Sequence, residues 1–341
     1  LAAHRTKAFL LILDDRIVGE WYAPDFSATK IHYTASMAKA VVGGVAAAVA
    51  LSDGRMKLDD PAANYIPQWR GDPVKSRITL RQLGSHTSGL DDAEDLDSNH
   101  KELTGWRGDF WKRLPPPRDP FTLARDVAPI VYPPGTNRRY SNPGIAMLGY
   151  ATTVALRDGP EKDLRTLLRE RVMRPISVAD GDWEVGYGQT VTVDGWPLVG
   201  SWGGGGYTAR ATARLARLML HQGEWEGRRL IEASAVRAVT EDSGTPGPGA
   251  IGWWSNNDGH VTALPRDAYW GAGAEDQLVL VIPTLKLISV RYGGPLDPTL
   301  LNDPAADRWF FTPLMTAIGK TDLQSTVASR VLWPDTVWPV A

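Results

Sequence analysis

Ser36-Met37-Ala38-Lys39 opens the longest unbroken helix-like stretch of this chain, which continues as AVVGGVAAAVAL from Ala40 to Leu51. The polar turn Ser52-Asp53-Gly54 ends it. Because the stretch is apolar on nearly every face, we expect a helix buried inside the fold. A serine and a lysine three positions apart lie on the same face of such a helix. The sequence therefore predicts a hydroxyl and an amine held together in the protein interior.

This pair has the properties of an activated nucleophile. A lysine amine surrounded by aliphatic side chains loses its proton near neutral pH and can act as a base. A serine at the amino end of a helix lies where backbone N–H groups favour developing negative charge. The same spacing recurs at Ser27–Lys30 and Ser98–Lys101, but neither of these has an apolar helix behind it. We therefore interpret Ser36 as a nucleophile and Lys39 as its base.

Both ends of the chain have the pattern of a β-hairpin. Residues 7–22 contain two apolar runs separated by a polar turn, and residues 277–291 contain two more. Between them, residues 60–200 are rich in proline, glycine and short helical patterns. We therefore expect an α/β fold of the α+β type, with a central antiparallel sheet that is built from both termini and flanked by helices.

The same pattern suggests how the chain is divided. We expect an α/β lobe of residues 1–58 plus 200–341, and a mostly helical lobe inserted as residues 59–199. A cleft between two lobes is the usual place for a ligand. The sequence therefore predicts one catalytic unit with its site between the lobes.

Composition excludes several classes of partner. With a net charge of −2 and a pI near 6.4, the chain is not expected to bind nucleic acid or anionic membranes. The longest apolar run, Val41 to Leu51, is too short to span a bilayer. There is no cysteine, which excludes thiol chemistry and is compatible with an exported protein. Because the first residue is Leu1, a trimmed leader is left open.

A candidate third catalytic group lies a hundred positions further on. Tyr140-Ser141-Asn142 is the only Tyr-x-Asn of the chain, and it follows a proline- and glycine-containing turn at residues 132–136. A phenol beside a lysine ammonium is stabilised as phenolate, so Tyr140 could accept the serine proton and return it to a leaving group. Taken alone, the tyrosine would be interpreted as an aromatic packed in a turn.

With these motifs the chain resembles the penicillin-recognising serine hydrolases, which include class C β-lactamases, DD-peptidases and family VIII carboxylesterases. The similar segments are Ser36–Lys39, Ile78–Leu90, Pro133–Gly144, Gly203–Arg210 and the final hairpin. The resemblance implies a β-lactamase/transpeptidase-like fold, no cofactor, no metal, and a small-molecule ester, amide or β-lactam substrate. It implies that Ser36 is acylated, Lys39 accepts the proton, Tyr140 is the acid/base partner and Asn142 is a ligand of substrate or lysine. A periplasmic or secreted location is favoured by the same resemblance.

The third motif of that family departs from its pattern here. There is no Lys-Thr-Gly, and His221-Gln222-Gly223 is interpreted as the end of a helix. Tyr269-Trp270-Gly271-Ala272-Gly273 occupies the expected place before the final hairpin. We therefore expect Trp270, Gly271 and Ala272 to line the substrate site, with the indole in place of a cation, as in some family VIII esterases. The oxyanion hole would consist of the amides of Ser36 and Gly273.

Three functions follow from this reading. The first is a hydrolase that cleaves a carboxylic ester, or an amide, through a Ser36 acyl-enzyme. The second is a class C-like β-lactamase or DD-peptidase in which Arg291 on the last strand replaces the missing cation. The third is a receptor or scaffold without turnover. The natural substrate, its acyl length and the oligomeric state are not determined by the sequence.

Two weaker signals are interpreted as structural. The acidic run Asp91–Asp97 could attract a cation, but we expect a solvated loop. His86 lies in a segment similar to the family and is expected to have a structural hydrogen-bonding role. The histidines show no metal-ligand spacing, so no metal site is expected.

Overall fold

The core of the molecule is a six-stranded antiparallel sheet with the strand order β10-β11-β12-β13-β1-β2, seen in a computed structural model that describes residues 1–95, 99–299 and 305–320. The sheet strands are β1 (Thr6–Leu13), β2 (Arg16–Tyr22), β10 (Trp254–Ser255), β11 (Tyr269–Gly273), β12 (Gln277–Ile282) and β13 (Leu287–Gly293). Strand β1 pairs with β13. This pairing joins the two ends of the chain, and both hairpins expected from the sequence are confirmed.

Shorter strands lie outside this sheet. They are β3 (His32–Tyr33), β4 (Trp183–Glu184), β5 (Thr190–Val193), β6 (Trp196–Val199), β7 (Gly206–Tyr207), β8 (Glu224–Trp225) and β9 (Arg228–Arg229). The helices are α1 (Val45–Ser52), α2 (Leu80–Gly84), α3 (Gly105–Lys112), α4 (Pro120–Thr122), α5 (Asn142–Ala155), α6 (Leu164–Leu168), α7 (Ala209–Leu220), α8 (Ala233–Thr240) and α9 (Thr312–Lys320).

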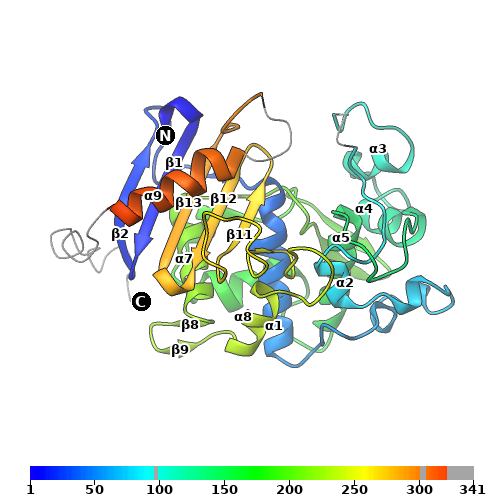
Figure 1. Ribbon diagram of the computed structural model, residues 1–341. Coiled ribbons are helices and arrows are strands. Elements are labelled where there is room, and N and C mark those ends of the chain that lie inside the picture. Colours follow the sequence, from blue (N-terminus) through cyan, green and yellow to red (C-terminus); the bar gives the residue numbers. More distant parts are fainter. Residues whose placement is uncertain (96–98, 300–304, 321–341) are drawn as a thin grey trace.

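The two faces of the sheet are covered by different helices. Figure 1 shows α9 across one face, with α7 on the other and α2 to α5 gathered beyond α1. Side chains alternate along β11, so that Tyr269 belongs to the main core and Trp270 to a second core under α9. The expected mixed fold with a central antiparallel sheet and helices is confirmed. The division into two lobes stays a prediction, and the segment expected to be mostly helical also contains β4, β5 and β6.

The stretch that follows Ser36 forms one continuous helical rod. It starts as a 3₁₀ turn at Ala35–Met37, widens into a π-helix at Lys39–Gly44 and continues as α1. Within the described residues it is the one helix long and apolar enough to cross a membrane, and 78% of that stretch is buried inside the fold. It therefore packs as the central helix of the core.

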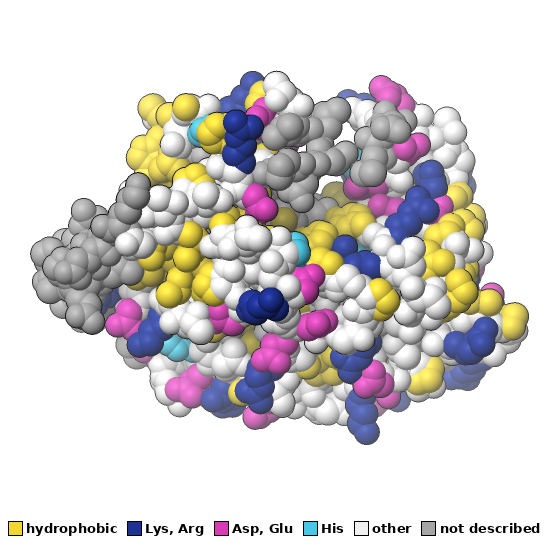
Figure 2. Space-filling view, viewed as in Figure 1, with side chains coloured by type: hydrophobic (Ala, Val, Ile, Leu, Met, Phe, Trp, Pro, Cys, Tyr) yellow, Lys and Arg dark blue, Asp and Glu magenta, His cyan; other side chains and the backbone are white. Residues whose placement is uncertain are grey.

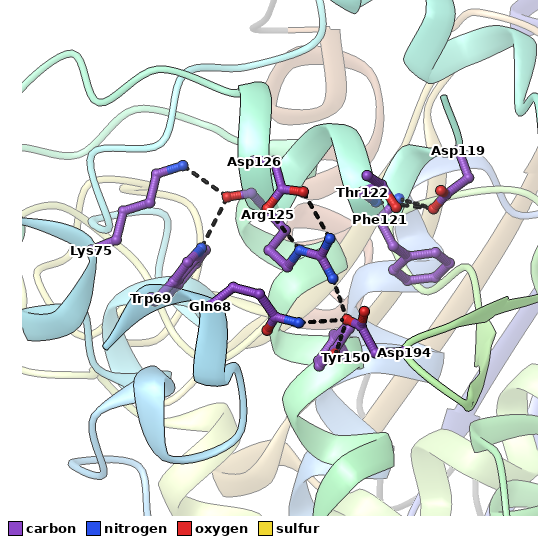
Figure 3. A network of polar contacts seen from close by, with 10 residues as sticks. All are labelled: Gln68, Trp69, Lys75, Asp119, Phe121, Thr122, Arg125, Asp126, Tyr150 and Asp194. Atoms are coloured by element: carbon purple, nitrogen blue, oxygen red, sulfur yellow. Dashed lines mark hydrogen bonds and ion pairs between the residues drawn. The ribbon is translucent and has the colours of Figure 1, made fainter. Parts of the chain in front are cut away.

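A polar network holds the β5–β6 hairpin against this helical region (Figure 3). Asp194, in the turn between these strands, accepts hydrogen bonds from Tyr150 of α5 at 2.7 Å and from Gln68 at 3.0 Å. The Arg125 guanidinium pairs with Asp194 and also with Asp126. Since the Arg125 side chain is largely buried, its charge is compensated by two carboxylates.

Candidate active site

Ser36 is fixed by the backbone around it. The preceding residue, Ala35, has a left-handed backbone with φ of 47°, an uncommon conformation for a residue with a side chain. Thr34 donates its amide to the Gly205 carbonyl at 3.2 Å and its hydroxyl to the Gly204 carbonyl at 2.7 Å. Gly204 and Gly205 both have positive φ, which lets their loop approach this closely. These contacts hold the turn that carries Ser36 against the Gly204–Gly205 loop.

Lys39 is buried and its amine contacts Ser36 directly. Its Nζ lies 3.0 Å from the Ser36 Oγ and 2.7 Å from the Asn142 Oδ1, and it also donates to the Trp202 carbonyl. The side chain is only 3% exposed. Burial lowers the pKa of Lys39 from 10.5 to about 8, although the charges of Glu94 and Asp92 oppose this change. About a tenth of the amine is therefore neutral at pH 7 and about half at pH 8, a shift in the direction that the sequence predicted.

Asn142 is held in one orientation by Asp92. The Asp92 Oδ1 accepts a hydrogen bond from the backbone N–H of Asn142 at 2.9 Å and another from the Nδ2 of the Asn142 side-chain amide at 3.0 Å. The opposite end of the same amide, Oδ1, therefore faces Lys39. Asn142 is fully buried, with both polar ends occupied. Its expected role as a ligand of the lysine fits these contacts, and its expected contact with substrate stays a prediction.

Tyr140 completes the group from the loop that precedes α5. Its ring centroid lies 4.6 Å from the Lys39 Nζ, and the Ser36 side chain lies close enough to the phenol to act on its pKa. The three groups singled out in the sequence thus converge. Burial, together with the negative charges of Glu94 and Asp92, raises the pKa of Tyr140 well above its usual range. The phenolate expected beside the lysine is therefore disfavoured, and the resting group is a neutral phenol.

His86 supports the ring of Tyr140. The two rings stack with centroids 4.7 Å apart, and the His86 Nδ1 accepts from the Ser141 amide at 3.1 Å. Burial holds the pKa of His86 well below its usual range, so the imidazole is neutral. Its structural role, expected from the sequence, fits these contacts.

The edge of β11 runs past the nucleophile. This strand pairs with β12 along its whole length, but β10 pairs only with Tyr269 and Trp270. A Cβ placed on Gly273 would lie 2.2 Å from the Thr34 carbonyl oxygen and 3.1 Å from the Ser36 nitrogen. Only a glycine permits this approach, which leaves the backbone of Gly273 next to the Ser36 amide. Figure 2 shows a hollow in this face of the molecule, lined by hydrophobic side chains with lysine or arginine beside them.

Trp270 does not face the nucleophile, contrary to the sequence-based expectation. Positions 271 and 273 face the nucleophile helix, with Gly271 packed against Met37, so Trp270 and Ala272 point to the opposite face of the sheet. The indole is 6% exposed and packs on Phe311 with ring centroids 5.6 Å apart. Trp270 is therefore a core residue, and Gly271 offers only backbone to a substrate. The partly exposed Ala272 has just a methyl group to contribute.

Arg291 is likewise unsuited to replace a missing cation. It is fully buried, and its guanidinium donates to the carbonyls of Asp276 at 2.7 Å, His4 at 2.8 Å and Gly294 at 2.6 Å. These contacts fix the turn that follows β11. It also donates to the Thr6 hydroxyl at 3.2 Å and to the Glu275 carbonyl at 3.3 Å, so all five N–H donors are occupied and the role suggested for Arg291 is wrong.

The acidic run after Leu90 is not the solvated loop expected from the sequence. Asp91 and Asp92 are buried, Asp91 pairs with Arg107 at 2.6 Å, and Glu94 pairs with His100 at 3.3 Å. Burial raises the pKa of Asp92 to about 6. The charges of Asp92 and Glu94 act on Lys39. In the sequence, the one sign of this was their position directly after Ile78–Leu90, the segment similar to the family. Ser98, in the rejected third Ser-x-x-Lys, lies outside the described residues together with Leu96 and Asp97.

Tyr187 is a further residue that sequence reasoning missed. Its phenol approaches Gly203, where an added Cβ would lie 2.7 Å from the Tyr187 oxygen. The Arg113 guanidinium lies 4.2 Å from its ring. Among the residues that the structure describes, no group of three histidine or acidic side chains is placed to hold a metal ion. The side chains that meet at the site are those of Ser36, Lys39 and Tyr140.

Several known proteins are similar to this chain. A curated relative, 6-aminohexanoate-dimer hydrolase of Paenarthrobacter ureafaciens, is 24% identical over 285 residues, or 79% of this chain and 65% of that protein. The chain spans less than two thirds of the curated relatives it matches. A structure described as a 6-aminohexanoate-dimer hydrolase of Bacillus anthracis superposes with a TM-score of 0.70 at 19% identity, covering 94% of this chain and 82% of the other.

A family VIII carboxylesterase superposes with a TM-score of 0.66 at 17% identity, and 91% of each chain is covered. At these identities the superpositions show a shared fold. The sequence profile of the Beta-lactamase family matches residues 3–292, which include Ser36, Lys39, Tyr140 and the whole of β11. The chain belongs to the Beta-lactamase family.

Proposed function

We propose that this protein is a serine hydrolase that cleaves a carboxylic ester through an acyl-enzyme on Ser36. The neutral amine of Lys39 takes the proton from the Ser36 hydroxyl as the Oγ attacks the carbonyl carbon. The resulting oxyanion is held by the amides of Ser36 and Gly273. Tyr140 donates its proton to the departing alkoxide, and Lys39 returns its proton to Tyr140. Water then attacks the acyl-enzyme and releases the acid.

The observation that carries this proposal is the 3.0 Å contact between the Lys39 Nζ and the Ser36 Oγ inside a buried site. A base is most useful when its pKa lies near the working pH, and burial brings the pKa of Lys39 to about 8. The raised pKa of Tyr140 keeps its proton available for donation. The two groups therefore suit different halves of the same proton transfer.

The preference for an ester rests on what faces the nucleophile from β11. Gly271 and Gly273 carry no side chain, and Arg291 is engaged by backbone carbonyls, so neither strand supplies the cation that a β-lactam carboxylate would need at that place. An amide substrate is the second candidate, because a curated relative is named as an amide-dimer hydrolase. Turnover of β-lactams or D-Ala-D-Ala peptides is the third. A receptor without turnover has no use for the converging amine and phenol.

Covalent labelling tests the nucleophile. The wild-type protein incubated with a fluorophosphonate should gain the mass of one phosphonyl group, and Ser36→Ala should gain none. Equal labelling of both proteins, or no labelling of the wild type, would refute the proposal. Specificity constants for 4-nitrophenyl butyrate and nitrocefin then separate the substrates. A much larger value for nitrocefin would overturn the ester preference.

A further inference from the structure

Arg138 stands at the margin of the active-site group, two residues before Tyr140. Its guanidinium carbon lies 4.4 Å from the ring centroid of Trp254. Trp254 is in β10, which pairs with the start of β11. The side chain therefore reaches from the loop that carries Tyr140 to the edge of the sheet that carries Gly273. Since Tyr140 is two residues further along the chain, its Cα lies at most about 7 Å from the Cα of Arg138.

Within the described residues, the Arg138 guanidinium has no hydrogen bond and no carboxylate partner. Its Nε is buried and makes no polar contact there. The neighbouring Arg139, by contrast, lies 3.2 Å from Asp91. The ionisable groups that influence Arg138 are Tyr132 and Tyr140, both neutral near pH 7, and burial lowers its pKa. Because arginine remains charged in proteins, a partly buried cation is left uncompensated beside the site.

The packing around the side chain keeps it in this place. A Cβ on Gly247 would lie 2.5 Å from the Arg138 Cδ, so the glycine makes room for the arginine stem. Trp254 covers the planar group on another side, an arrangement that stacks the guanidinium without using its N–H donors. The Nε is buried, so the terminal Nη groups are the donors that a planar anion would reach.

We propose that Arg138 binds a carboxylate carried by the substrate, so that the preferred substrates are anionic esters or amides. This inference rests on the proposed function. A guanidinium recognises a carboxylate through two parallel hydrogen bonds, which gives orientation as well as affinity. The carboxylate would be separated from the scissile carbonyl by several bonds, because Arg138 lies to the side of Tyr140. Arg138 would thus hold a carboxylate at a different place from the one where β11 lacks a cation, on the loop that carries Tyr140.

Matched pairs of esters test this assignment. One pair is 4-nitrophenyl butyrate and mono-4-nitrophenyl glutarate, with the carboxylate on the acyl side. The other is phenyl acetate and 3-carboxyphenyl acetate, with the carboxylate on the leaving group. The ratio of kcat/KM within each pair is measured for wild type, Arg138→Gln and Arg138→Lys. Arg139→Gln is the control, since it removes an equal charge that is already paired.

In one of the pairs, Arg138→Gln should lower the anionic-to-neutral ratio by roughly ten- to a hundredfold, and Arg138→Lys should lower it less. Arg139→Gln should leave the ratio within about threefold of wild type. An unchanged ratio, or an equal loss on the anionic and neutral esters, would overturn the role of Arg138. Ser36→Ala separates the two proposals: if it retains hydrolysis of the neutral esters, the proposed function fails irrespective of the ratio.

Discussion

Replacing Asp92 by asparagine should shift the pH dependence of catalysis towards acid. The carboxylate contacts Lys39 only through the Asn142 amide, by hydrogen bonds of 3.0 and 2.7 Å. Adding the width of that amide places the two charges roughly 7 Å apart. At an effective dielectric constant of about 20, their attraction is then about 2.4 kcal/mol, equivalent to about 1.7 pKa units. The negative charge stabilises the Lys39 ammonium, so its removal lowers the pKa of Lys39.

The expected result is an acid limb of kcat/KM that moves from about pH 8 to roughly pH 6.3 in Asp92→Asn. Asparagine can still accept a hydrogen bond from Asn142, so the geometry is perturbed little. Above about pH 6 the wild-type Asp92 is ionised, and the comparison between the two proteins therefore reports its charge. The limb belongs to the coupled group rather than to Lys39 alone.

The assay is kcat/KM for 4-nitrophenyl butyrate between pH 5.5 and 9.5 at constant ionic strength. Asp91→Asn serves as the control, because Asp91 pairs with Arg107 and Arg139 and does not contact Asn142. Its limb should stay within a few tenths of a pH unit of wild type. A limb in Asp92→Asn that stays in place, or moves to higher pH, would show that Lys39 is not the titrating base.

Three further substitutions probe other parts of the structure. Lys39→Met should abolish hydrolysis. Because the pKa of Lys39 is lowered to about 8 in the folded protein, the free energy of unfolding of the wild type should rise between pH 8 and 10.5 by up to roughly 3 kcal/mol more than that of the variant. Urea unfolding at several pH values measures this, and an equal dependence of stability on pH in the two proteins would contradict it. Gly273→Ala should push β11 away from Thr34, since the new Cβ would lie 2.2 Å from the Thr34 carbonyl oxygen, and kcat/KM for 4-nitrophenyl butyrate should fall by about a hundredfold or more. Retained activity would show that the close approach of Gly273 to the Ser36 turn is not required. Asp194→Ala should lower the free energy of unfolding by about 1–3 kcal/mol and leave kcat unchanged, because it removes the hydrogen-bond acceptor of Tyr150 and one ion-pair partner of Arg125, away from Ser36. A fall in kcat would show that this network positions the site.

The sequence contained the main features of the fold because local patterns and long-range pairing agree in it. The apolar stretch after Ser36 could only be a buried helix, and the terminal hairpins had clear turns. The convergence of Ser36, Lys39 and Tyr140 was accessible through their motifs. Such features depend on residue type and spacing, which a sequence states directly.

The remaining features depend on which face of an element a side chain occupies. Trp270 was expected in the site because a short strand beside glycines gives no indication of its buried face. Asp92 was assigned to a solvated loop because its charge is compatible with water, and the burial comes from α3 and α5 packing around it. Arg291 looked available until the backbone carbonyls of the adjacent turn were seen to occupy it. In each case tertiary contacts overrode a local preference.

The nucleophile and its base are carried by the first turns of a helical stretch, Ala35–Ser52, that is 78% buried inside the fold. A local opening that freed this helix would have to disrupt the whole interior at once. No partly unfolded form should therefore lose catalytic activity while it keeps its tertiary structure. Heat inactivation should consequently coincide with the cooperative loss of tertiary structure. Under the proposed function, the rate of hydrolysis of a simple chromogenic ester would measure directly how much of the sample is folded.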